Sequence, residues 1–86
     1  MKINDKFKID CVNGHTVIID CESNTVCGTV EFNEIKMFLW QITKARNLTK
    51  SEMLDAALNE FEISTVLALG EIDSFIRKLK ELGIIS

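Results

Sequence analysis

Residues Thr25 to Asn33 read TVCGTVEFN, and this stretch decides how the rest of the chain is arranged. Its first eight residues, Thr25–Phe32, include β-branched side chains and no proline, which predicts a β-strand. Asn33 follows, and an asparagine oxygen readily accepts a backbone N–H from the first turn of a helix. The stretch therefore predicts a strand that leads directly into a helix. At the edge of a sheet, such a strand would offer unpaired N–H and C=O groups that must be protected, covered or used.

Upstream of this strand the sequence predicts a hairpin. Phe7–Val12 alternates apolar and polar residues, Asn13-Gly14 follows, and His15–Asp20 is again rich in β-branched residues. Asn-Gly between two such runs is a strong hairpin signal. With the polar turn at residues 22–24, the first third of the chain is expected to form three antiparallel strands.

The faces of these strands are harder to assign. A two-residue turn at Asn13-Gly14 would place Phe7 and Ile9 on the face opposite to the other apolar side chains, so we expect a bulge or a longer loop near the hairpin. If the loop between the second and third strands has four residues, the side chains expected to share one face are Val17, Ile19, Val26, Val30 and Phe32.

Three helices are predicted downstream. Glu34–Arg46 has apolar residues at helical spacing, and Thr49 with Glu52 forms a capping box that starts a second helix. A third helix is expected from Val66 to Leu82, with Ser64 or Thr65 as its cap. Gly83 suits the left-handed residue that ends a helix. The apolar stripes of the three helices are Ile35, Phe38, Leu39 and Ile42; Met53, Leu54, Ala57, Leu58 and Phe61; and Leu69, Ile72, Phe75, Ile76, Leu79 and Leu82.

Two details of the third helix are left open by the sequence. Gly70 inside it costs about 1 kcal/mol relative to alanine, so a later start near Gly70 is an alternative. Asp73 and Arg77 are four residues apart, a spacing that favours an ion pair on the outer side of the helix. The element order βββααα predicts an α+β fold that resembles a winged helix-turn-helix, within one domain over residues 1–86.

Composition narrows the function. The net charge is −3 and the pI is near 5.0, which disfavours non-specific nucleic-acid binding. The charged N-terminus and the lack of a long apolar run predict a cytoplasmic protein with no membrane contact. Cys11, Cys21 and Cys27 lack close ligand spacing and are expected to be free thiols, with no metal and no cofactor. No nucleophile–base pair or phosphate loop is apparent, so we expect no enzymatic activity.

From Phe32 onward the chain resembles the PqqD family, whose members serve in pyrroloquinoline-quinone biosynthesis or as related peptide-recognition elements. The resembling positions are Phe32-Asn33, Leu39-Trp40 and Ile42; Thr49, Glu52-Met53, Leu58 and Phe61; and Glu71-Ile72, Phe75-Ile76, Leu79 and Gly83-Ile84-Ile85. The three strands match in layout only. The chain departs from the family pattern in having Phe32 where leucine is usual, and in the more apolar stretch Val66–Gly70.

This resemblance implies a function. Such a domain would bind the leader of a ribosomally made precursor peptide. The leader would pair with the third strand and lie in the groove beside the third helix. The domain would then present the peptide to a modifying enzyme, often a radical S-adenosylmethionine (SAM) enzyme. Arg77, Lys78 and Lys80 are candidates to pair with acidic leader residues, and a solvated helix face is the alternative explanation of these three residues. The peptide-binding residues expected on this basis are Thr25, Val26, Cys27, Gly28, Thr29, Val30, Glu31, Asp73, Ile76, Arg77 and Lys80.

Within the expected strand, Gly28 would let a partner backbone approach closely, although a simple bulge explains it equally well. Two other functions stay open at this level: a winged helix that binds DNA, and an adaptor that binds another protein. The second helix offers only Lys50 as a basic residue, which argues against DNA. The expected oligomeric state is a monomer or a dimer formed through edge strands.

Overall fold

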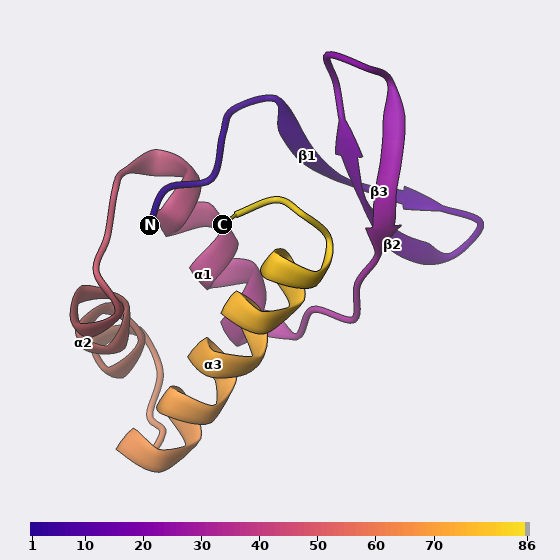
Figure 1. Cartoon of the computed structure of the whole chain (residues 1–86). Coiled ribbons are helices and arrows are strands. Elements are labelled where there is room, and N and C mark those ends of the chain that lie inside the picture. Colours follow the sequence, from indigo (N-terminus) through magenta and orange to yellow (C-terminus); the bar gives the residue numbers. More distant parts are fainter. Residues whose placement is uncertain (86) are drawn as a thin grey trace.

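Three antiparallel strands lead into three helices in the computed structural model, which describes residues 1–85 (Figure 1). The elements are β1 (Phe7–Val12), β2 (His15–Asp20), β3 (Thr25–Thr29), α1 (Glu34–Ala45), α2 (Lys50–Glu60) and α3 (Thr65–Glu81). The sheet order is β1-β2-β3, so β2 is central and the other two strands are edges. The predicted α+β fold, βββααα, is confirmed. Among residues 1–85, no helix has both the length and the apolar character needed to span a bilayer.

The hairpin between β1 and β2 has a two-residue turn at Asn13-Gly14, without the bulge or longer loop that the predicted apolar face required. Asn13 and Gly14 have φ angles of 52° and 79°, as the two central residues of a type I′ turn need, and Val12 pairs with His15. This register places Ile9 opposite Ile18. The core face of the hairpin is therefore the one that carries Ile18, and the expectation of a bulge or longer loop near the turn is wrong.

The bulge lies instead between β2 and β3. Ile18 pairs with Gly28 while Ile19 pairs with Val26, which leaves Cys27 as the extra residue of β3. After this bulge, Val30 lies on the core side with Ile18, and both are buried. Val17 and Ile19 belong to the opposite face, because side chains alternate along β2. The predicted grouping of Val17, Ile19, Val26, Val30 and Phe32 on one face is thus wrong.

The third strand is also shorter than Thr25–Phe32, because it ends at Thr29. The chain leaves the sheet there so that Phe32 can pack on the helices. The Phe32 ring centroid lies 5.5 Å from that of Phe75 and 6.3 Å from that of Trp40. Phe32 therefore joins the sheet to both α1 and α3.

The helix boundaries follow local capping. Asn33 accepts the Lys36 N–H at 2.9 Å, and the capping box of Thr49 and Glu52 is present. Ser64 caps α3, which runs without interruption from Thr65 through Gly70, so the alternative start near Gly70 is wrong. At the other end, Gly83 has a φ of 73° and the Ile84 N–H donates to the Leu79 carbonyl at 2.9 Å. This is the Schellman motif that the sequence predicted.

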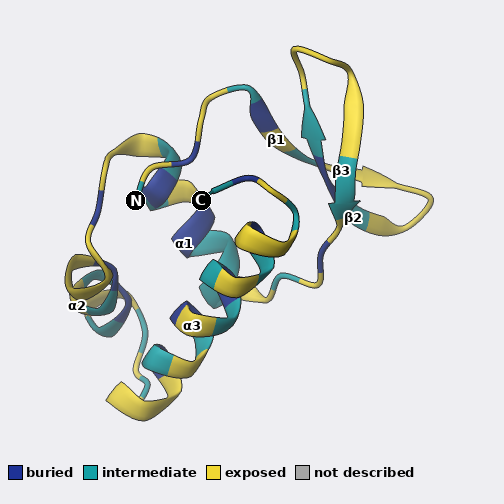
Figure 2. Ribbon diagram, in the orientation of Figure 1, coloured by how far each residue is buried: buried dark blue, intermediate teal, exposed yellow. Residues whose placement is uncertain are grey.

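The core lies between the inner face of the sheet and the helices, and Figure 2 shows the buried residues on these facing surfaces. Its largest fully buried side chains are Phe75, Ile3, Ile18, Leu39, Met53, Ile72 and Leu79. Ile3 reaches the core because its N–H donates to the Thr43 carbonyl at the end of α1. Helix α3 supplies three of these seven side chains and therefore forms the central support of the fold.

Candidate functional site

The two edges of the sheet differ in how far the chain satisfies them. On β1, the Lys6 carbonyl accepts the Cys21 N–H, so the backbone groups of the next residue, Phe7, point outward. The Phe7 N–H donates to the Asn4 carbonyl at 3.1 Å, and its carbonyl accepts the Lys44 ammonium. Further along, the Cys11 N–H donates to the Asp10 carboxylate at 2.7 Å. Both backbone groups of Phe7 and the Cys11 N–H are therefore engaged, whereas within residues 1–85 no hydrogen bond outside the β1–β2 ladder reaches Ile9 or the Cys11 carbonyl. The outer edge of β1 is thus only partly occupied by the chain itself.

The outer edge of β3 is open. The Val30 N–H donates to the Thr16 carbonyl at 2.9 Å, so the alternation of an antiparallel ladder turns the backbone groups of Thr29 and Glu31 away from β2. Within residues 1–85, no hydrogen bond outside the β2–β3 ladder reaches either residue. Both residues are exposed. Because the bulge at Cys27 interrupts the ladder, the regular open edge is short and runs over residues 28–31.

Gly28 has a role inside the molecule. A Cβ built at Gly28 would lie 2.5 Å from Cδ2 of Leu82, the residue that ends α3. The missing side chain therefore makes room for Leu82. A partner backbone on this side of Gly28 would meet Leu82, so close approach of a partner along the strand edge stays a prediction. The alternative explanation, a bulge, is present next to Gly28, at Cys27. The contact also fixes where the end of α3 lies against the edge strand.

A groove lies between the end of β3 and α3. Its volume is about 450 Å³. The lining residues are Thr29, Glu31, Phe32, Lys36, Ser74 and Lys78. The residues from α3, Ser74 and Lys78, are one helical turn apart, and the next residue at this spacing is Leu82, which packs on Gly28. One face of α3 thus follows the open edge.

Charge in this groove is partly neutralised. The Lys36 ammonium lies 2.7 Å from the Glu71 carboxylate, and the Asn33 amide donates to the same carboxylate at 3.1 Å. The hydrogen bond from Lys36, with help from Asn33, outweighs partial burial and holds the pKa of Glu71 below its usual value. Lys78 is held more loosely, because its ammonium is 3.9 Å from the Glu81 carboxylate. Lys78 is therefore the groove cation best able to meet a carboxylate of a ligand.

The structure divides the predicted site residues into two groups. Residues 25–31 form the open strand and its continuation, although the Val30 side chain is buried in the core. On α3 the predicted residues face elsewhere. Asp73 pairs with Lys50 of α2 rather than with Arg77, and Ile76 and Lys80 line a different cavity.

Arg77 is exposed and lines neither the groove nor the second cavity. The groove residues missing from the predicted set are Phe32, Lys36, Ser74 and Lys78, of which Lys78 was expected only as a cation. Contact of any of these residues with a peptide stays a prediction.

The second cavity lies on the other side of α3, beside the N-terminal segment. Its volume is about 540 Å³. It is lined by Met1, Lys2, Asn4, Leu48, Thr49, Lys50, Met53, Ile76, Lys80, Ile84 and Ile85. Because neither edge strand contributes to its lining, this cavity offers no backbone for strand pairing.

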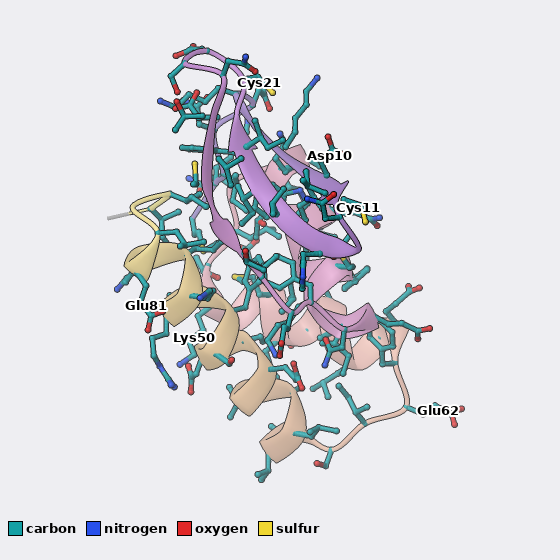
Figure 3. The ribbon with its side chains drawn as sticks, turned by 90° about the vertical axis from the view of Figure 1, so that its right-hand side faces the viewer. Asp10, Cys11, Cys21, Lys50, Glu62 and Glu81 are labelled. Atoms are coloured by element: carbon teal, nitrogen blue, oxygen red, sulfur yellow. The ribbon has the colours of Figure 1, made fainter. Side chains whose placement is uncertain are left out.

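The three cysteines do not converge. Cys11 and Cys21 lie at opposite ends of the β1–β2 hairpin, as Figure 3 shows, and Cys27 is half-buried in β3. Within residues 1–85, no group of three or more His, Cys, Asp or Glu side chains is arranged to hold a metal ion. The groove beside β3 combines the open backbone groups of the strand with the side chains of Glu31, Phe32, Lys36 and Lys78.

Comparisons with known proteins bear on the fold. No family model matches the chain, so the resemblance to the PqqD family is not established at the level of sequence, and no curated protein matches it either. Among solved structures, the chain is similar to that of TbiB1 in complex with the TbiA(beta) leader peptide, with a TM-score of 0.67 and 17% sequence identity. The match covers 98% of this chain and 93% of the other. The two proteins therefore share one fold over nearly their whole lengths.

Proposed function

We propose that this chain binds the leader segment of a ribosomally made precursor peptide along β3 and presents it to a modifying enzyme of the radical SAM type. The observation that carries the proposal is an open sheet edge that adjoins a groove. Within residues 1–85 the outward groups of Thr29 and Glu31 form no hydrogen bond, and both residues line the groove beside α3. On β1, by contrast, both groups of Phe7 and the Cys11 N–H are engaged, which leaves Ile9 and the Cys11 carbonyl. An added strand obtains its main-chain hydrogen bonds from such an open edge.

The groove supports a peptide rather than a small molecule. It lies along the open edge, so side chains of an added strand would enter it in alternation. Phe32 offers an apolar surface there, and Lys78 offers a positive charge. The expected leader segment is therefore extended and carries an apolar residue close to an acidic one.

The similar fold of TbiB1, solved with the TbiA(beta) leader peptide, supports a leader as the class of ligand. The radical SAM character of the enzyme is supported by the PqqD-like pattern of the sequence. A gene for such an enzyme beside this gene and beside a short peptide gene would add independent support.

A proline at the open edge tests the strand-pairing mode. Thr29→Pro removes an outward N–H and places a ring on the edge, while the β2 ladder keeps its bonds. Thr29→Val is the matched control because it keeps the N–H. With a synthetic leader peptide from the neighbouring precursor gene, calorimetry should show an affinity loss of about tenfold or more for Thr29→Pro and little change for Thr29→Val.

The position of the peptide is checked by amide chemical shifts. Titration of the same leader peptide into the ¹⁵N-labelled chain should move the signals of residues 28–31 and 74–78. Equal affinity of both Thr29 variants and the wild type would contradict pairing on β3, as would shifts confined to the second cavity around Ile76 and Lys80.

A further inference from the structure

The start of α3 exposes two adjacent apolar side chains. Val66 is 82% exposed and Leu67 is 48% exposed. The other large apolar side chains exposed to this degree within residues 1–85, Val12 and Val26, lie on the sheet. Neighbouring exposed apolar residues on a helix indicate a contact surface more strongly than single ones do.

Gly70 extends this surface by one helical turn. It lies four residues after Val66, is exposed, and has no atom within 4 Å of the position that a Cβ would take. Glycine within a helix costs about 1 kcal/mol relative to alanine, and no contact inside the molecule requires it here. A bare turn lets another molecule approach the helix backbone closely. Val66, Leu67 and Gly70 together are called the α3 tip.

The surroundings of the α3 tip are acidic. Residues 51–76 contain six Asp or Glu residues and no Lys or Arg, and two of the six, Glu71 and Asp73, are paired with Lys36 and Lys50. Glu60 and Glu62, on the chain that leads into α3, are exposed and form no ion pair within residues 1–85. Figure 3 shows Glu62 projecting away from the body of the molecule. A symmetric contact with a second copy would bring these like charges together, which disfavours self-association here.

We propose that the α3 tip is the docking surface for the modifying enzyme, which would offer an apolar contact bordered by lysine or arginine. This inference rests on the proposed function. Helix α3 has 17 residues and is about 25 Å long. The groove is lined by Ser74 and Lys78 in the second half of α3, whereas the tip is at the start of the helix. Figure 1 shows these two ends of α3 at a distance from each other, which would let leader and enzyme bind at the same time.

Three substitutions test the docking surface with the radical SAM enzyme encoded beside this chain as the probe. Val66→Lys removes the apolar contact and adds a charge that repels a basic partner. Val66→Glu also removes the contact but adds a charge that a basic partner attracts, and Val12→Lys makes the same charge change as Val66→Lys on β1. With the leader peptide present at saturation, we expect Val66→Lys to weaken enzyme binding by about tenfold or more and Val66→Glu to weaken it less. Val12→Lys should change it by less than about twofold.

Separate measurements distinguish the failure of each proposal. Calorimetry with leader peptide alone should give equal affinity for all three variants, since none of them alters the groove, and thermal melts should show that each is folded. If the wild-type chain does not bind the leader peptide, the proposed function is rejected. Intact leader binding with equal enzyme affinity for Val66→Lys and Val12→Lys would overturn docking at the α3 tip. A dimer in sedimentation that Val66→Lys abolishes would assign the tip to a second copy and would also overturn it.

Discussion

At Gly28, the absence of a Cβ lets the edge strand pack directly against the end of the last helix. Its neighbour is Leu82, whose Cδ2 would lie only 2.5 Å from an added Cβ. Leu82 ends α3, and the Gly83 turn after it returns Ile84 to the core. This contact between a glycine and a leucine therefore joins the edge strand to the end of the helix that lines the groove.

Gly28→Ala should lower the free energy of unfolding by about 1 kcal/mol, because the Leu82 side chain must move aside. Leu82→Ala makes room for the new methyl group, so the double variant should be more stable than the sum of the single effects predicts, by about 0.5 kcal/mol or more. Urea denaturation of the four proteins measures this coupling. Strict additivity would show that the two positions do not touch in solution.

Glu71 is the residue whose ionisation matters most for the groove. It joins Asn33, which caps α1, to Lys36 in the first turn of the same helix. These partners lower the pKa of the Glu71 carboxyl in the folded chain. The stabilisation is therefore fully present above the pKa of the unfolded chain, near 4.5, and is lost as the pH falls through the lower pKa of the folded state.

Glu71→Gln should consequently reduce the free energy of unfolding at pH 7, and its deficit relative to the wild type should shrink as the pH is lowered from about 5 to 3. Denaturation curves across this range check the sign of the effect. Glu60→Gln is a suitable control, because Glu60 is exposed and forms no ion pair within residues 1–85. A deficit for Glu71→Gln that stays constant with pH would argue against the ion pair.

At the scale of elements, helix ends were predictable and strand details were not. Asn33, Thr49, Ser64 and Gly83 act on atoms within a few residues of themselves, so sequence alone identifies them. Gly28 indicated a bulge as one alternative, but its position at Cys27 depends on the pairing with β2. The contact of Gly28 with Leu82, which lies more than 50 residues further along the chain, has no local signal in residues 25–32.

Helix α3 tolerates a glycine that its own packing does not explain. Gly70→Ala should raise the free energy of unfolding by about 0.5–1 kcal/mol, because the backbone is helical there and no atom lies near the new methyl group. Thermal or urea denaturation measures the gain, and affinity for leader peptide should not change. A loss of stability would mean that the helix is not regular at this position.

At the scale of the whole molecule, the sequence predicted the fold and the strand β3 that forms one wall of the groove. The apolar stripe of α3 was predicted, and Ile72, Phe75 and Leu79 are indeed buried in it. A stripe has two flanks, however, and their neighbours depend on how the helix is placed against the sheet. The flank with Ser74 and Lys78 follows β3, whereas that with Ile76 and Lys80 lines the second cavity. Only the assembled structure distinguishes the two.

The unequal edges of the sheet also bear on how many further strands one molecule can bind. Growth into a fibril by strand addition requires two receptive edges on each subunit, as polymer growth requires bifunctional monomers. Here both groups of Phe7 and the Cys11 N–H on β1 are engaged, which leaves Ile9 and the Cys11 carbonyl, whereas β3 offers the groups of Thr29 and Glu31. A guest strand on β3 would therefore leave only the interrupted edge of β1 for further strand addition.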